Sequence, residues 1–106
     1  METEFCIVLC TCPQKSIAEQ IAHAAVSQEL AACVSIIDKV ESVYLWQGEV
    51  QQDNEVQLIF KTKRQLTDDL FKLVISFHPY DVPEWLILDV ASGSEAYLNW
   101  VRDSLK

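Results

Sequence analysis

The sequence predicts an α+β fold with the order strand, helix, strand, strand, helix, strand, followed by one more helix. Two observations support this prediction. Segments with apolar residues at every second position alternate with segments in which apolar residues recur every three or four positions. The chain also has only two glycines and three prolines among 106 residues, and no segment is low in complexity. We therefore expect one compact domain over residues 1–106.

The first half of the chain supplies one strand, one helix and a long hairpin. Residues 5–12 are apolar and partly β-branched, which favours a strand. From 14 to about 29 the apolar residues follow three- and four-residue steps, which indicates an amphipathic helix. Residues 33–47 form a second extended segment, and after Gly48 a third covers roughly 54–63 with strict apolar alternation. These two extended segments predict the hairpin.

The second half repeats the pattern of helix and strand. A helix from about 65 to 77 has its apolar residues on one side, and residues 84–91 form a fourth strand. Ser94 is expected to cap a last helix that ends near Leu105. This β-α-β-β-α-β order is that of a ferredoxin-like sandwich, an antiparallel sheet with two helices on one face, here with an extra C-terminal helix.

The predicted sheet has more apolar surface than its own helices can cover. Strands 5–12 and 84–91 are apolar on both faces, whereas two helices cover only one face. Half of all residues are hydrophobic, which is high for so small a domain. We therefore expect a partner subunit on the open face.

Charge and cysteine content predict the partners and the compartment. Eight basic and sixteen acidic residues give a net charge of −8, which repels nucleic acid and anionic lipid, so we expect neither as a partner. The acidic segment Met1–Glu4 is unlike a secretory signal, and no membrane span is apparent. The four cysteines are expected to be reduced thiols, because three of them lie on one short strand. These features favour the cytoplasm.

Two cysteines and one histidine are candidate metal ligands. Cys10 and Cys12 lie on the same face of strand 5–12 and are therefore neighbours. They would form a soft thiolate pair suited to Cu(I) or Zn, with His78 as a candidate nitrogen ligand. The alternative is that buried cysteines are only small apolar residues. His23, in the middle of a helix, is not expected to be a ligand.

The segment Phe77–Glu84 is the second candidate site, because Pro79 and Pro83 stiffen the backbone that carries a histidine, a tyrosine and a carboxylate. The alternative is a plain connection between helix and strand. Aromatic and charged residues elsewhere could form a cleft with this segment. They are Tyr44, Trp46, Glu55, Lys61, Tyr80, Glu84 and Trp100.

One interpretation of these residues is a cleft in which Lys61 and Glu84 meet an anionic or zwitterionic small molecule between aromatic walls. The other is that the two charges form an ion pair at a subunit interface. The sequence has no glycine-rich phosphate loop and no nucleophile motif, so we expect no enzymatic activity.

Taken together, six short motifs resemble the CutA family of divalent-cation tolerance proteins, over nearly the whole chain from Phe5 to Leu105. They are Leu9-Cys10-Thr11, Leu30-Ala31-Ala32-Cys33-Val34, Tyr44-x-Trp46-x-Gly48, the stretch from Glu55-Val56 through Lys61-Thr62, His78-Pro79-Tyr80-x-x-Pro83-Glu84, and Tyr97-Leu98-x-Trp100.

The resemblance implies a homotrimer in which the long hairpins join the sheets of neighbouring subunits. It implies copper binding through Cys10 and through a pair of histidines before the Pro-Tyr, of which this chain has only His78, with Phe77 in the first position. No cofactor is expected to be needed for folding. The family's trimer also resembles the PII signalling proteins, which implies small-molecule binding between subunits as an alternative function. A third alternative is a purely structural assembly module.

Overall fold

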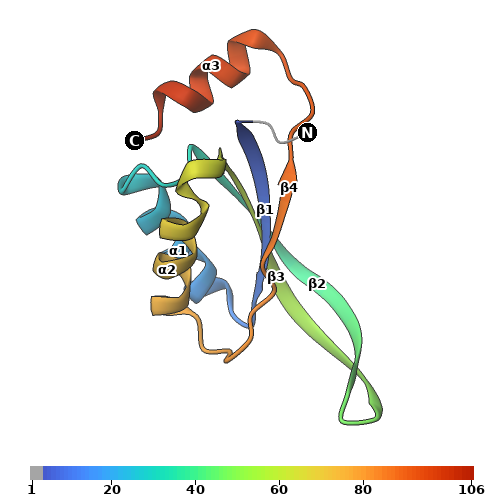
Figure 1. Ribbon diagram of the computed structural model, residues 1–106. Coiled ribbons are helices and arrows are strands. Elements are labelled where there is room, and N and C mark those ends of the chain that lie inside the picture. Colours follow the sequence, from blue (N-terminus) through green and yellow to red (C-terminus); the bar gives the residue numbers. More distant parts are fainter. Residues whose placement is uncertain (1–3) are drawn as a thin grey trace.

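The computed structural model describes residues 4–106 as a four-stranded sheet with helices on one of its faces (Figure 1). Every pair of neighbouring strands is antiparallel, in the order β2-β3-β1-β4. This arrangement confirms the predicted ferredoxin-like α+β fold with an extra C-terminal helix. The elements, in chain order, are β1 (Phe5–Cys12), α1 (Lys15–Ser27), β2 (Cys33–Trp46), β3 (Glu49–Lys63), a 3-10 turn (Arg64–Leu66), α2 (Thr67–Phe77), β4 (Leu86–Asp89) and α3 (Glu95–Asp103).

The hydrophobic core lies between the sheet and the two helices α1 and α2. On β1 the side chains of Cys6 and Val8 point into it, and each is at most 1% exposed. On β3 the alternating residues Val56, Leu58 and Phe60 are at most 3% exposed. The predicted alternation of both strands is therefore confirmed, and one face of the sheet is fully used for packing.

The hairpin of β2 and β3 extends well beyond the helices (Figure 1). Its turn consists of Gln47 and Gly48, with φ values of 50° and 81°. Positive φ at both central residues is what a type I′ turn requires, and Gly48 adopts it without steric cost. Because Trp46 pairs directly with Glu49, β3 begins at Glu49 and not near residue 54 as predicted.

A bulge in β2 separates the packed part of the hairpin from its outer part. The register with β3 shifts between Ile37 and Val40. Within the bulge Lys39 has a φ of 60°, and its N–H donates to Asp38 Oδ1 at 2.8 Å. Such a bulge bends a strand and increases its twist, which is consistent with the crossing of the two strands in Figure 1.

The apolar surface that the sequence predicted on the open side of the sheet is present. β4 is shorter than the predicted 84–91 and pairs with β1 over four residues only. Its residues Leu86 and Leu88 lie on that face, opposite Leu9 and Ile7 of β1, and are 53% and 46% exposed. Among the described residues, no helix lies over that face (Figure 1).

The helical predictions are confirmed with two adjustments. The predicted helix 65–77 begins with a 3-10 turn before α2 starts at Thr67, and Phe77 at its last turn is 39% exposed. Ser94 caps α3 as predicted, because its Oγ accepts a hydrogen bond from the N–H of Tyr97. α3 closes the end of the core opposite the hairpin tip with buried Val101.

Candidate functional site

His78 lies directly after α2 and is tied to the end of β1. Its Nε2 is 2.6 Å from the main-chain oxygen of Thr11, and its Nδ1 is 3.1 Å from the N–H of Tyr80. Because Nδ1 accepts that hydrogen bond, Nε2 carries the proton and donates it to Thr11. His78 is 9% exposed and has extended backbone before Pro79, as the sequence predicted. Both ring nitrogens are therefore hydrogen-bonded to main-chain groups.

The thiols of Cys10 and Cys12 lie next to this imidazole. The two Sγ atoms and a ring nitrogen of His78 are all within 4.8 Å of one another. Within residues 4–106, these three side chains are the set of cysteine, histidine or acidic residues whose ligand atoms lie close enough together to hold a metal ion. The sequence predicted that the two cysteines are neighbours, and the fold brings His78, which follows Cys12 by 66 positions in the sequence, to them.

The two thiols differ in acidity because they share one hydrogen bond. This contact with Cys12 raises the pKa of Cys10, and burial and the carboxylates of Glu84 and Glu55 raise it further. Conversely, the hydrogen bond from Cys10 lowers the pKa of Cys12. Cys12 is therefore the thiol of the pair that ionises first, and Cys10 stays protonated beside it.

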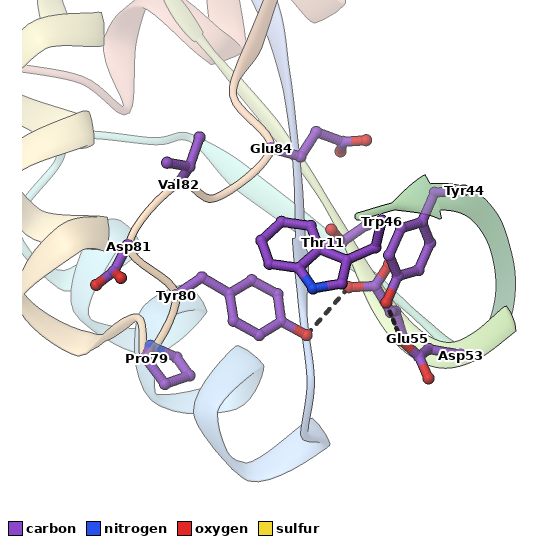
Figure 2. Close-up of a pocket in the computed structure, with 10 residues that line it drawn as sticks. All are labelled: Thr11, Tyr44, Trp46, Asp53, Glu55, Pro79, Tyr80, Asp81, Val82 and Glu84. Carbon is purple, nitrogen blue, oxygen red and sulfur yellow. Dashed lines mark hydrogen bonds between the residues drawn. The ribbon is translucent and has the colours of Figure 1, made fainter. Parts of the chain in front are cut away.

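A cavity of about 670 Å³ lies beside this cluster, between the hairpin and the loop that follows α2 (Figure 2). Five of the seven residues predicted to form a cleft line it, and Lys61 and Trp100 do not. The lining residues are Thr11, Tyr44, Trp46, Asp53, Glu55, Pro79, Tyr80, Asp81, Val82 and Glu84.

The cavity has aromatic walls and a negative potential. The hydroxyl of Tyr44 donates to Asp53, and this hydrogen bond, with the carboxylates nearby, raises the pKa of Tyr44 to about 12. The hydroxyl of Tyr80 lies 3.4 Å from Glu55 Oε2, and burial followed by the charge of Glu55 raises the pKa of Tyr80. Both phenols thus stay protonated and point at carboxylates (Figure 2).

Lys61 and Trp100 lie outside the cavity. Lys61 is opposite Ile7 on the sheet, and its Nζ contacts Ser35 Oγ and lies 3.6 Å from Cys33 Sγ. Trp100 is on α3, where it is 47% exposed. One chain therefore does not bring Lys61 to Glu84, whose Oε1 instead lies 3.3 Å from the amide of Gln57.

Asp53 and Thr11 are cavity residues that sequence reasoning missed. Asp53 precedes the predicted third strand, which starts near residue 54, although Gln51, Asp53 and Glu55 continue the alternation of that strand toward the turn. Extending the period-two pattern would have found it. Thr11 had no such signal, because a threonine facing a cavity has the same local pattern as one facing a partner strand.

None of the helices in the part of the chain that the structure describes is long and apolar enough to cross a membrane.

Comparison with known proteins identifies the family. The family model described as CutA1 divalent ion tolerance protein matches residues 6–104. The chain belongs to the CutA1 family. The divalent-cation tolerance protein CutA of Thermus thermophilus is 43% identical over 98 residues, which are 92% of this chain and 95% of that protein. The crystal structure of CutA1 from Oryza sativa has a TM-score of 0.94 at 40% identity, covering 99% of this chain and 96% of the other.

CutA proteins differ in length and in the compartments that their names give. Protein CutA of Homo sapiens is 44% identical over 92 residues, but these are 87% of this chain and only 51% of the human protein. This chain thus spans about half the length of its mammalian and plant relatives. The relative from Arabidopsis thaliana is named chloroplastic, and the structure from Archaeoglobus fulgidus, with a TM-score of 0.92, is named periplasmic.

Proposed function

We propose that this divalent-cation tolerance protein binds copper, as Cu(I), or another soft metal ion through Cys10 and His78, with Cys12 as a third ligand. The observation that carries this proposal is the convergence of their three ligand atoms within 4.8 Å. Thiolate sulfur with one imidazole nitrogen is a donor set preferred by Cu(I) and Zn over Mg or Ca.

The geometry needs little contraction to accept an ion. Ligand atoms bound at about 2.3 Å are at most about 4.6 Å apart, close to the separations present. The ion would replace the thiol protons, beginning with the more acidic Cys12, and binding should therefore release protons. His78 would have to give up one hydrogen bond, either to Thr11 or from Tyr80, to free a ring nitrogen. Cys12 supplies the ligand that Phe77 cannot.

The test is a copper titration under reducing conditions with a competing chelator. Cys10→Ser, Cys12→Ser and His78→Ala should each weaken binding, whereas Cys33→Ser is the matched control because Cys33 contacts Lys61 outside the cluster. Stoichiometric binding that is lost in the cluster variants alone supports the site. Weak binding that no substitution changes contradicts it.

A homotrimeric assembly is part of the proposal. It is supported by the open face of β4 and by the outer hairpin, where Val43, Leu45 and Val50 are 65%, 69% and 74% exposed. Such contiguous apolar surface is unusual for a monomer of this size, and an isolated two-stranded ribbon is marginally stable in water. Sedimentation of the purified protein as a monomer at micromolar concentration would contradict the proposal.

A second function, small-molecule binding between subunits as in a PII-like signalling trimer, is supported by the cavity of about 670 Å³. Its volume lies within the range of about 300–1,000 Å³ typical of ligand sites. Under either function the protein is proposed to be cytoplasmic and not an enzyme. The net charge of −8 disfavours nucleic-acid and membrane partners. The remaining alternative is a structural module, in which these side chains only hold subunits together.

A further inference from the structure

The charges that line the cavity are all negative. Asp53, Glu55, Asp81 and Glu84 are among its ten lining residues, which include no lysine, arginine or histidine. In Figure 2 the Asp81 carboxylate points away from the aromatic rings, whereas the carboxylates of Asp53 and Glu55 lie to one side of Trp46 and that of Glu84 to the other. Three negative charges therefore surround the aromatic part of the cavity.

These three carboxylates have neutral partners. Asp53 accepts from the Tyr44 hydroxyl, Glu55 from the Tyr80 hydroxyl, and Glu84 from the Gln57 amide. Within residues 4–106 none of the three makes an ion pair. Lys15 and Lys39 line a smaller neighbouring cavity that shares Glu55, but they do not line this one. Within one chain, the negative charge of these three carboxylates is thus not neutralised by a basic side chain.

The arrangement is unsuited to a bare metal ion. A hard cation needs several oxygens that converge on one point, and among residues 4–106 the converging set is the cysteine and histidine cluster, not these carboxylates. Separated carboxylates fit a ligand whose positive charges are also separated. The rings of Tyr44, Trp46 and Tyr80 add apolar faces that attract both alkylammonium groups and the methylenes between them.

We propose that the cavity binds a linear aliphatic polyamine, with its ammonium groups at Glu55 and Glu84 and its methylene chain against Trp46. This inference rests on the small-molecule function proposed above and names the chemical class of the ligand. It differs from the anionic or zwitterionic ligand that the sequence suggested, because Lys61 lies outside the cavity and only acidic side chains remain in it.

Spermidine is the probe, titrated calorimetrically into the full chain at physiological salt, with citrate and Mg²⁺ as comparison ligands. Glu55→Gln and Glu84→Gln should each weaken spermidine binding at least about fivefold, since each removes one close charge pair. Glu19→Gln is the matched control, because it removes the same charge from an exposed position on α1. In NMR spectra the indole N–H signal that Trp46→Phe removes should be the one that spermidine shifts.

Several results would overturn the inference. If Glu19→Gln weakened spermidine binding as much as the cavity variants, the binding would be diffuse attraction of a cation by an acidic protein. The same would follow if Mg²⁺ bound as tightly as spermidine. Binding of citrate in place of spermidine, lost in Trp46→Ala, would refute the ligand class but leave the small-molecule function standing. If spermidine did not bind and the glutamine variants changed the oligomeric state, Glu55 and Glu84 would instead contact a second copy of the chain. Copper affinity, measured in parallel, keeps these outcomes separate from the metal site.

Discussion

The imidazole of His78 donates a hydrogen bond of 2.6 Å to the main-chain oxygen of Thr11, across 67 positions of the sequence. This contact joins the end of α2 to the end of β1. The Thr11 side chain lines the cavity, and the ring of Tyr80, another lining residue, lies 4.9 Å from the His78 ring. The candidate metal cluster and the cavity therefore share a wall.

His78→Ala should lower the free energy of unfolding of the metal-free protein by about 1–3 kcal/mol, because the buried Thr11 carbonyl loses its imidazole donor and keeps only the weak thiol contact from Cys10 at 3.7 Å. Urea denaturation monitored by circular dichroism measures this change. His23→Ala is the control, since His23 is exposed on α1 and its loss should change stability by no more than about 0.5 kcal/mol. Equal effects of the two substitutions would show that the contact with Thr11 contributes nothing to stability.

Tyr44 should ionise near pH 12, where the ordinary value is about 10, because its hydroxyl donates to Asp53. The folded protein holds this proton more tightly than the unfolded chain, so the stabilisation is complete below about pH 10 and is lost as the pH rises toward 12. Absorbance of tyrosinate during a pH titration measures the pKa. In Asp53→Asn the Tyr44 transition should move toward the ordinary value, and an unchanged transition would contradict the assignment.

Gly48→Ala should loosen the hairpin tip. An alanine at a φ of 81° costs about 1 kcal/mol even though nothing lies within 4 Å of the added methyl group. Hydrogen exchange of the amides flanking the turn should therefore be faster by about fivefold. Gln47→Gly is the comparison, because it removes the same kind of strain at a φ of 50° and should not accelerate exchange. Faster exchange in both variants would show that the turn geometry is not what orders the tip.

Leu45→Glu should dissociate the proposed trimer without unfolding the subunit. Leu45 is 69% exposed within one chain, so a charge there is tolerated in the monomer but is expensive in an apolar interface. Sedimentation velocity reports the mass, and circular dichroism reports the fold. Gln20→Glu adds the same charge on exposed α1 and should leave the mass unchanged. A trimer that persists in Leu45→Glu would place the outer hairpin outside the interface.

Local patterns were sufficient for most of the fold. The range 5–12 for β1 agrees with the structure, because alternation and β-branching are properties of the strand itself. The beginning of β3 could not be found in this way. Gln47 is not one of the residue types, such as Gly, Asn or Asp, that indicate a positive φ. The polar residues after Gly48 resemble a loop until their partners on β2 are known.

The sequence could predict the candidate site only where neighbouring site residues lie on the same helix or strand. Alternation placed Cys10 beside Cys12, whereas the approach of His78 depends on how α2 packs against β1. The position of Lys61 depends on register. Thr11 pairs with Gln57 and Ile7 with Lys61, so Lys61 lies four residues, roughly 13 Å, along the strand from the Thr11 level. No local sequence pattern indicates this distance between Lys61 and the Thr11 level along the strand.

The helix α3 is joined to the start of the described chain, since Arg102 bonds to Glu4, and the N–H of Lys106 donates to the main-chain oxygen of Glu29. Figure 1 places α3 and the C-terminus at the end of the molecule opposite the hairpin tip. A fluorophore, an affinity tag or a fused domain at the C-terminus would therefore extend away from the hairpin. Labelled protein can serve in the metal, polyamine and sedimentation experiments with its hairpin left unobstructed.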